Sequence, residues 1–149
     1  MKIYCAHAIS GRSATEVLEY YDEINKKLTV MGFNVLHPMV GKGYMRTEIK
    51  FKAEGYGNPL SSNHAIKERD KWMVSMADVV YINLLGTKTP SIGCISELAW
   101  GDMLGKHTVL VMEKDNCHRH AFMLEMADII LETEDEALEY LRKIAQREI

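Results

Sequence analysis

The feature that most constrains the fold is the nearly continuous apolar run at residues 78–85, DVVYINLL. A strand with one face in water alternates apolar and polar side chains, and this run does not alternate. Strands of this composition are covered on both faces, as in parallel sheets that have helices packed on either side. The run therefore predicts a buried parallel strand in an α/β domain.

Four further segments predict strands, at residues 2–7, 33–37, 107–113 and 128–131. Capped amphipathic segments alternate with them. A capping box at Ser13 and Glu16 opens one helix, and a second box at Thr133 and Glu136 opens the last helix. The stripe of the first helix consists of Val17, Tyr21, Ile24, Leu28 and Met31.

This alternation predicts one domain over residues 1–149, a doubly wound, five-stranded parallel sheet flanked by helices, of the flavodoxin or Rossmann-like type. Ligands of such sheets bind at the carboxyl ends of the strands. Here those ends are residues 7–12, 85–93 and 114–120, together with the loop after His37. Between residues 39 and 62 the pattern disappears, and a loop of that length is either a lid over the substrate or simply mobile.

Composition restricts the partners and the compartment. The net charge of -3, from 18 basic and 21 acidic residues, leaves no basic stripe for a nucleic-acid polymer. Cys5, Cys94 and Cys117 are odd in number and far apart, so we expect neither a disulfide framework nor a zinc ribbon. No signal peptide fits before the first strand, and no apolar run approaches the roughly 18 residues of a membrane helix. These features predict a cytoplasmic protein that does not bind membranes.

The loop after the first strand suits a single phosphate. The loop lacks the GxGxxG fingerprint of dinucleotide-binding sites, and the chain has no GxxxxGK[ST] P-loop. The sequence therefore gives little support for a classical NAD or ATP site. Ser10, Gly11 and Arg12 still offer backbone N–H groups, a hydroxyl and a guanidinium just before a helix. The alternative is a plain turn with a solvent-facing arginine.

The loop after the central strand supplies Ser91 and Gly93 and leads into a helix that carries Glu97. A carboxylate near a helix N-terminus is stabilised as the anion, which favours a nucleophile over a general acid. Retaining glycosyl transfer uses such a nucleophile, because it traps an oxocarbenium-like carbon as a covalent ester. The alternative is that Glu97 only complements the helix dipole.

Asp70 falls on the apolar stripe of the helix before the central strand, together with Ile66, Met73 and Ala77. An ionised carboxylate there must be paired, hydrogen-bonded or at the rim of a pocket, since burying it alone is too costly. Asp70 is therefore either a site residue or a residue at the solvent boundary of a rotated helix.

Three segments carry a family resemblance: IYCAHAISGR at residues 3–12, RDKWMVSMADVVYINL at residues 69–84 and TPSIGCISELAWGDMLGKHTVLV at residues 89–111. Together they resemble the nucleoside 2-deoxyribosyltransferase superfamily, which includes the 2'-deoxynucleoside 5'-phosphate N-hydrolases. The resemblance extends from Lys2 to about Leu131. Its most specific part is the Gly-x-x-x-Glu-Leu-Ala pattern that contains Glu97.

The resemblance implies roles for three residues. Glu97 matches the glutamate that attacks the anomeric carbon of the sugar, and Tyr4 matches a strand tyrosine that hydrogen-bonds this glutamate. Asp70 matches an aspartate that donates a proton or handles the base. We expect no cofactor.

Two departures bear on the substrate that the resemblance implies. Many transferases have an aspartate where this chain has Ser91, and the spelling around it looks closer to the nucleotide N-hydrolases. The matching residues of those enzymes hold the 5'-phosphate, so Ser10, Gly11, Arg12, Ser91 and Gly93 are the candidate phosphate-binding residues. The functional C-terminal tail of the transferases has no obvious counterpart, because this chain ends in a predicted helix.

The resemblance also implies a homodimer or larger homo-oligomer, in which a neighbouring subunit completes the site from the segment before the last strand. In this chain that segment contains His118, His120 and Met123, and the two histidines are placed to touch a phosphate or base across the interface. No metal is expected there, since no third ligand lies nearby in the sequence.

The sequence thus predicts an enzyme that cleaves the N-glycosidic bond of a 2'-deoxynucleoside or its 5'-monophosphate through a covalent intermediate on Glu97. The deoxyribosyl group then passes to another base or to water, and the sequence does not separate these outcomes or identify the base. The alternative from a different class is a non-catalytic nucleotide-binding or sensing protein on the same fold.

Overall fold

The computed structural model describes residues 1–9, 11–43 and 57–147. In this part of the chain five strands form one sheet with the order β2-β1-β3-β4-β5, and every neighbouring pair is parallel. The strands are β1 (Lys2–His7), β2 (Asn34–Leu36), β3 (Val79–Asn83), β4 (His107–Val111) and β5 (Ile129–Leu131). The predicted doubly wound α/β fold is confirmed, with β1 as predicted and the other strands shorter than their apolar runs.

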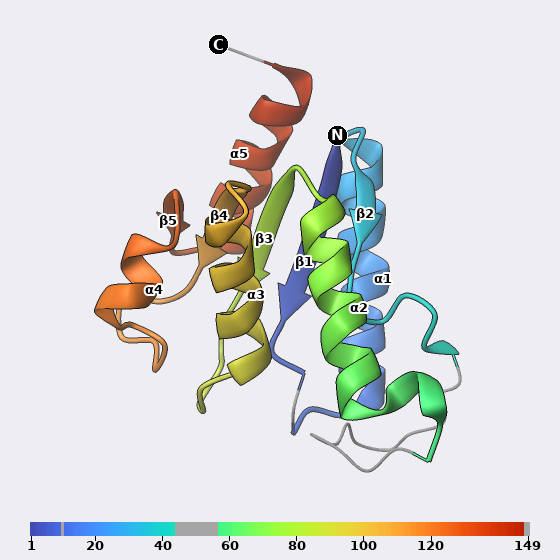
Figure 1. Ribbon diagram of the computed structural model, residues 1–149. Coiled ribbons are helices and arrows are strands. Elements are labelled where there is room, and N and C mark those ends of the chain that lie inside the picture. The colour runs from blue at the N-terminus through green and yellow to red at the C-terminus, as the bar shows by residue number, and fades with distance from the viewer. Residues whose placement is uncertain (10, 44–56, 148–149) are drawn as a thin grey trace.

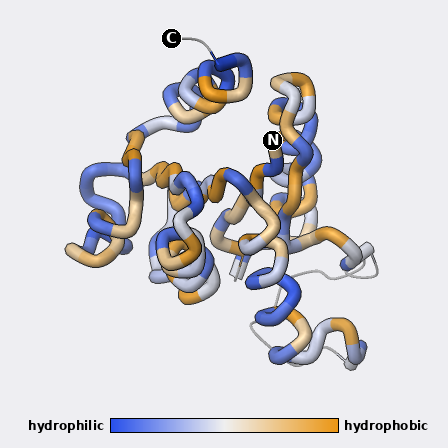
Figure 2. The backbone as a smooth tube through the Cα atoms, turned by 45° about the horizontal axis from the view of Figure 1, so that its top comes forward, coloured by the Kyte–Doolittle hydropathy of each residue, from blue (hydrophilic) through white to orange (hydrophobic). Residues whose placement is uncertain are grey.

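Helices cover both faces of the sheet (Figure 1). They are α1 (Ala14–Val30), α2 (Asn63–Met76), α3 (Ile92–Met103), α4 (Ala121–Glu125) and α5 (Glu134–Gln146). One face packs against α1 and α5, and the other packs against α2, α3 and α4. The helices show hydrophilic and hydrophobic residues in turn along their length, as expected for elements with one buried side (Figure 2).

Successive strand residues point to opposite faces, which divides the core in two. In β1, Ile3 and Cys5 pack on the α1 and α5 side, whereas Tyr4 packs on the α2 and α3 side. Both sets are fully buried, so the pattern that predicted strands covered on both faces is correct. The register of β1 thus sends the Tyr4 side chain toward α3.

Local capping explains where the helices begin. Ser13 with Glu16 and Thr133 with Glu136 form the two predicted capping boxes, and the Ser62 hydroxyl accepts from the backbone N–H of Ala65. The short helix α4 was not predicted, because its five residues are too few to show an amphipathic period.

The predicted loop over residues 39–62 is only partly described. Met39 to Gly43 continue from β2 in turns, and Pro59–Ser61 form a short 3₁₀ helix before α2. The prediction of a lid falls mainly on residues 44–56, which lie outside the described residues. Within the described ranges, no helix combines the length and apolar character that crossing a membrane requires.

Helix α3 lies close against the sheet because it carries Gly101. A Cβ atom at this position would lie 3.1 Å from the Cγ2 atoms of both Thr108 and Val80. Gly101 is one helical turn beyond Glu97, so this close approach also sets how near Glu97 comes to β1.

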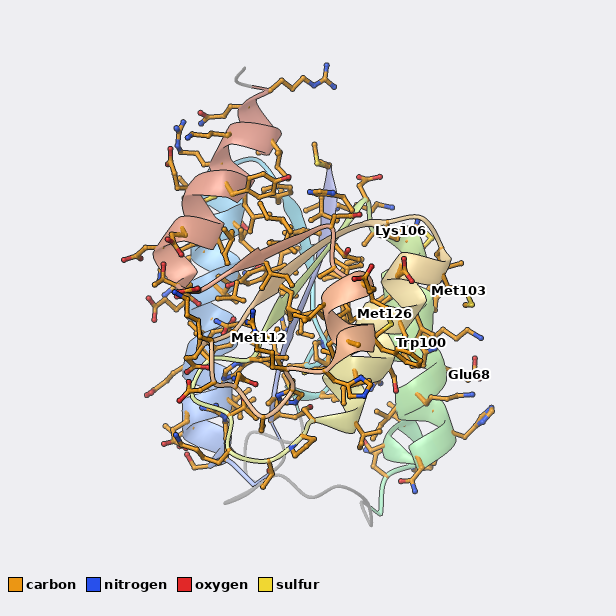
Figure 3. The ribbon with its side chains drawn as sticks, turned by 90° about the vertical axis from the view of Figure 1, so that its left-hand side faces the viewer. Glu68, Trp100, Met103, Lys106, Met112 and Met126 are labelled. Atoms are coloured by element: carbon orange, nitrogen blue, oxygen red, sulfur yellow. The ribbon has the colours of Figure 1, made fainter. Side chains whose placement is uncertain are left out.

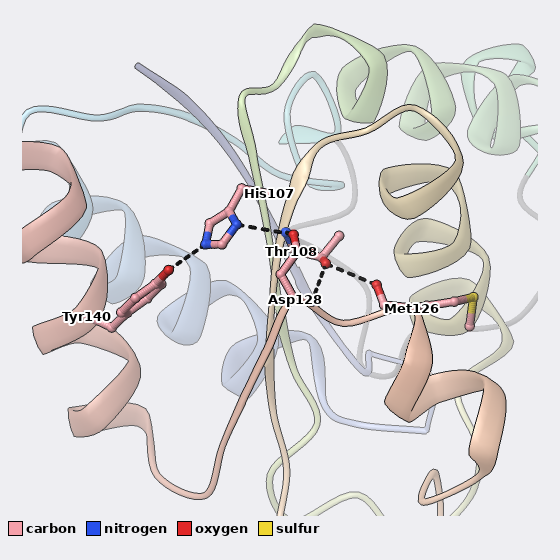
Figure 4. Close-up of polar contacts among 5 residues, drawn as sticks. All are labelled: His107, Thr108, Met126, Asp128 and Tyr140. Atoms are coloured by element: carbon pink, nitrogen blue, oxygen red, sulfur yellow. Dashed lines mark hydrogen bonds and ion pairs between the residues drawn. The ribbon is translucent and has the colours of Figure 1, made fainter.

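The amino ends of β4 and β5 are joined to α5 by a polar network (Figure 4). His107 Nδ1 lies 3.1 Å from an Asp128 oxygen, and its Nε2 is hydrogen-bonded to the Tyr140 hydroxyl at 2.7 Å. The same Asp128 oxygen accepts from the backbone N–H of Thr108 at 2.8 Å. This network lies at the start of β4, and therefore at the end of the strand opposite the predicted ligand edge.

Candidate functional site

Tyr4 and Glu97 meet in the interior of the protein. The Tyr4 hydroxyl donates a hydrogen bond of 2.6 Å to Glu97 Oε1. Tyr4 is fully buried and Glu97 is only 6% exposed. β1 and β3 are neighbours whose outgoing connections diverge, so α3, which follows β3, delivers Glu97 to the crevice above both strands. The structure places these two residues together, as their predicted roles require.

Asp70 faces the same crevice from α2. A cavity of about 310 Å³ between α2 and α3 is lined by both Asp70 and Glu97, together with Asn63, Ile66, Lys67, Ile92, Gly93, Ser96 and Trp100. Figure 3 shows Trp100 and Met103 in succession along α3, with Glu68 on the neighbouring α2. Asp70 is 7% exposed, which places it at the edge of the cavity and not at the outer surface. The cavity is mostly apolar in its walls, with two carboxyl groups at its inner end.

Both carboxyl groups hold their protons unusually tightly. Desolvation raises the pKa of Glu97 to about 7 and that of Asp70 to about 6. The hydrogen bond from Tyr4 opposes the rise at Glu97, whereas the charge of Asp70 adds to it. The pair therefore titrates together near neutral pH.

The expectation that the helix N-terminus keeps Glu97 ionised is wrong. Glu97 is the sixth residue of α3, which begins at Ile92, and the dipole acts mainly within the first turn. Burial dominates instead and favours the neutral acid. The Tyr4 hydroxyl, not the helix end, is the largest influence that favours the carboxylate of Glu97.

Lys42 is a member of this cluster that sequence reasoning missed. Its side chain is buried, and its positive charge lowers the pKa of both Asp70 and Glu97. The two carboxyl groups in turn oppose the fall in the pKa of Lys42 that burial causes. Lys42 comes from the irregular segment after β2, where no periodicity marks a residue as buried, so the sequence carried no signal for it.

Arg69 adds a second cation beside Asp70 at 3.9 Å. Its Nη1 donates to the carbonyl oxygen of Leu60, which ties the end of the 3₁₀ helix to α2. Asp70 Oδ1 is buried without a hydrogen bond to any described residue. The carboxyl group of Asp70 thus retains an unused hydrogen-bonding position in the crevice.

A second cavity of about 310 Å³ lies at the carboxyl ends of β1 and β3. It is lined by Ala8, Gly11, Arg12, Gly86, Thr87, Lys88, Thr89, Pro90 and Ser91. Three of the five predicted phosphate-binding residues, Gly11, Arg12 and Ser91, therefore share one cavity. Gly93 lines the carboxyl cavity instead, and Ser10 lies outside the described residues.

The second cavity carries one cation and one hydroxyl that were not predicted. Lys88 adds an ammonium to the guanidinium of Arg12, and Thr87 Oγ1 is buried without a hydrogen-bond partner among the described residues. Arg12 itself makes a long hydrogen bond of 3.4 Å to the carbonyl oxygen of Leu85. A cavity with two cations and a free hydroxyl suits an anion.

Ser91 is engaged differently from the prediction. Its hydroxyl caps α3 by accepting from the backbone N–H of Cys94 at 3.4 Å, and its own N–H donates to His118 Nε2 at 2.7 Å. The N–H of Ser91 is therefore not offered to a ligand.

The three residues predicted to reach a neighbouring subunit have partners in their own chain. His118 is 3% exposed and binds Ser91, and Met123 is 3% exposed in the core beneath α4. His120 is exposed and caps α4, with Nδ1 accepting from Phe122 N–H. His118 and Met123 are thus buried within their own chain, and a contact of these three residues with a neighbouring subunit stays a prediction. Among the described residues, no three metal-binding side chains come together.

Solved structures with the same fold include two deoxyribosyltransferases and a CMP N-glycosidase. A 2-deoxyribosyltransferase from Bacillus psychrosaccharolyticus superposes with a TM-score of 0.68 at 18% identity, over 94% of this chain and 92% of that one. A 2-desoxiribosyltransferase from Leishmania mexicana gives 0.61 at 15% identity, over 99% of both chains. A CMP N-glycosidase from Clostridium botulinum gives 0.58 at 15% identity, over 95% of this chain and 97% of that one.

By sequence alone, no protein-family model and no curated protein matches the chain. The similarity is in three-dimensional structure, and it extends over nearly the whole length of this chain and of each of the three solved structures. The chain therefore has the fold shared by the 2-deoxyribosyltransferases and the CMP N-glycosidase.

Proposed function

We propose that the protein cleaves the N-glycosidic bond of a 2'-deoxynucleoside or its 5'-monophosphate and passes the sugar to another base or to water. The observation that carries this proposal is the buried Tyr4 to Glu97 hydrogen bond of 2.6 Å at a cavity shared with Asp70. The shared fold with two deoxyribosyltransferases and an N-glycosidase supports it.

In the first step the Glu97 carboxylate forms a bond to C1' of the sugar. The bond from C1' to the base nitrogen breaks, and its electron pair leaves with the base, which takes a proton from Asp70. In the second step water or an acceptor base forms the new bond to C1'. The ester electrons return to Glu97, and Asp70 takes a proton back.

This mechanism needs one proton on the carboxyl pair, held by Asp70 while Glu97 is ionised. The Tyr4 hydrogen bond lowers the pKa of Glu97, but burial leaves that pKa at about 7, against about 6 for Asp70. The single proton therefore rests mainly on Glu97 before the reaction and must pass to Asp70 as the substrate binds. Lys42 keeps the pair from taking up a second proton at neutral pH, since its charge lowers both pKa values. The cluster is thus suited to hold one negative charge on two largely buried carboxyl groups.

The 5'-monophosphate is the better of the two substrate classes on the charges of the second cavity. Arg12 and Lys88 line it, and the Thr87 hydroxyl has no hydrogen-bond partner among the described residues. A phosphate offers oxygen acceptors for all three groups. A nucleoside without phosphate leaves these groups without a ligand.

One assay tests the activity and separates its two forms. Deoxynucleosides and deoxynucleoside monophosphates are each incubated with a foreign base, and the exchanged product is measured against free base and sugar. Glu97→Gln keeps an oxygen for the Tyr4 hydroxyl, and we expect turnover to fall about a thousandfold or more. Unchanged turnover in this variant contradicts the mechanism. Tight binding without product in the wild type indicates a binding protein instead.

The phosphate assignment has its own test. Arg12→Ala should raise KM for the monophosphate about tenfold or more while leaving the nucleoside reaction within about twofold. Arg142→Ala on α5 is the matched control, because Arg142 pairs with Glu139 on the surface away from both cavities. Equal losses on both substrates in Arg12→Ala contradict the assignment.

A further inference from the structure

The loop that lines the second cavity is held by the segment that follows β4. The cavity loop comprises residues 84–91, between β3 and α3, and the holding segment comprises residues 113–118. Glu113 Oε1 accepts from the backbone N–H of Gly86 at 2.7 Å, and His118 Nε2 accepts from that of Ser91 at 2.7 Å. The two ends of the cavity-lining stretch are therefore fixed by side chains far away in sequence.

Asn116 connects the two contacts. Its Nδ2 donates to the carbonyl oxygen of Leu84 at 2.9 Å and to Glu113 Oε2 at 2.7 Å. Its Oδ1 accepts from the backbone N–H of His118 at 3.0 Å and lies 2.8 Å from His118 Nδ1. The Asn116 side chain thus makes four polar contacts, two through its nitrogen and two through its oxygen.

The network also determines the tautomer of His118. The oxygen of Asn116 only accepts, so His118 Nδ1 carries the proton, and Nε2 is left as an acceptor for Ser91. Asn116 and His118 are 8% and 3% exposed, so water does not readily replace these contacts. Breaking them leaves the partly buried N–H of Ser91 and the buried amide of Asn116 without these partners.

We propose that Glu113, Asn116 and His118 form a clamp of positioning residues that holds the cavity loop in the shape that binds the phosphate of the substrate. None of the three lines the cavity, so they act through Gly86 and Ser91. The clamp assigns an intrachain function to His118, which the sequence had assigned to a subunit interface. The link to phosphate rests on the proposed function, whereas the clamp itself does not.

The first test needs no substrate. Amide hydrogen exchange is measured by NMR at Gly86 and Ser91 in the wild type, His118→Ala, His118→Gln and Glu113→Ala. We expect exchange at Ser91 to be about tenfold faster in His118→Ala and largely restored in His118→Gln, whose amide oxygen can accept in place of Nε2. In Glu113→Ala the faster exchange should appear at Gly86.

Lys114→Ala is the matched control, because Lys114 lies in the same segment but is exposed and pairs only with Glu132 among the described residues. A destabilised fold accelerates core amides as well, so faster exchange confined to Ser91 or Gly86 distinguishes the clamp from unfolding. Unchanged exchange at both amides in the Ala variants overturns the clamp.

The second test measures KM and kcat for a deoxynucleoside and its monophosphate. His118→Ala should raise KM for the monophosphate about tenfold, with kcat within about threefold and nucleoside KM unchanged, and His118→Gln should restore most of the loss. An equal change on both substrates overturns the link to phosphate. If the wild type has no turnover, the proposed function fails, and the exchange result still decides the clamp.

Discussion

Glu97 sits where a carboxylate is costly, and the groups around it reduce that cost selectively. Burial favours the acid, while the Tyr4 hydroxyl and the Lys42 ammonium favour the anion. Asp70 lacks the tyrosine contact and has cations beside it. Burial outweighs the hydrogen bond, so the pKa of Glu97 stays above that of Asp70.

Tyr4→Phe removes that hydrogen bond without changing the shape of the core. Because a hydrogen bond to a charged group contributes about 1.5–3 kcal/mol, we expect kcat to fall about 10- to 100-fold. The pKa of Glu97 should rise, which moves the basic limb of the rate profile, set by the higher of the two pKa values, to higher pH. Steady-state kinetics across pH measures both effects, with far-UV circular dichroism as the control for folding. A normal kcat with an unmoved basic limb contradicts the role of Tyr4.

The pH profile of kcat/KM should be bell-shaped. The active form carries one proton on the pair, so the rate rises as pH passes about 6 and falls beyond about 7. In Lys42→Met both limbs should move to higher pH, because the lost positive charge had lowered the pKa values of Asp70 and Glu97.

Arg69→Gln is the comparison for Lys42→Met. Arg69 is among the causes that lower the pKa of Asp70, whereas for Glu97 that part is played by Lys42 and Tyr4. In Arg69→Gln we therefore expect the acidic limb, near the pKa of Asp70, to move to higher pH further than the basic limb. A Lys42→Met profile that superposes on the wild type contradicts the assignment of Lys42 to the cluster.

At the scale of elements, α3 is the helix on which the site depends. It caps on Ser91, carries Glu97 in its second turn and packs on the sheet at Gly101. Strand–helix alternation and caps were predictable, because apolar periodicity and capping hydroxyls act within a few residues. The short β2 and β5 and the five-residue α4 were less so, because such elements depend on packing more than on their own pattern.

Gly101→Ala should destabilise the protein by about 1–3 kcal/mol, because its Cβ would lie 3.1 Å from two buried Cγ2 atoms. Gly93→Ala is the matched control in the same helix, since a Cβ there meets nothing within 4 Å. That control should stabilise slightly, by about 0.5–1 kcal/mol, through the higher helix propensity of alanine. Urea unfolding measures both. Equal free energies of unfolding for the two variants contradict the close approach of α3.

At the scale of the whole molecule, the buried carboxyl group of Glu97 makes the stability of the fold depend on pH. The folded pKa of Glu97 is raised above its unfolded value, so the folded state binds the proton more tightly. The associated stability is present at low pH and is lost as pH rises through about 7. Burial lowers the pKa values of His7 and His37 to about 4. The stability that these two histidines contribute is therefore present at neutral pH and is lost as pH falls toward 4.

Glu97→Gln should therefore stabilise the fold at pH 8 and change it little at pH 5. The gain is on the order of 1–3 kcal/mol, because each unit of pKa shift corresponds to about 1.4 kcal/mol. Chemical unfolding of both proteins at the two pH values gives the difference, in which the histidine contributions cancel. A variant that is less stable than the wild type at pH 8 contradicts burial of an ionised Glu97.

The sequence by itself determined the parallel α/β sheet and the starts of α1, α2 and α5, and it supplied the prediction that Tyr4, Asp70 and Glu97 are site residues. Periodicity and caps are local, and the motif around Glu97 is continuous in the chain. Only the tertiary structure decided the raised pKa of Glu97, the burial of Lys42 and the hydrogen bond between His118 and Ser91. These depend on desolvation and on contacts between segments far apart in sequence, and no local pattern encodes either.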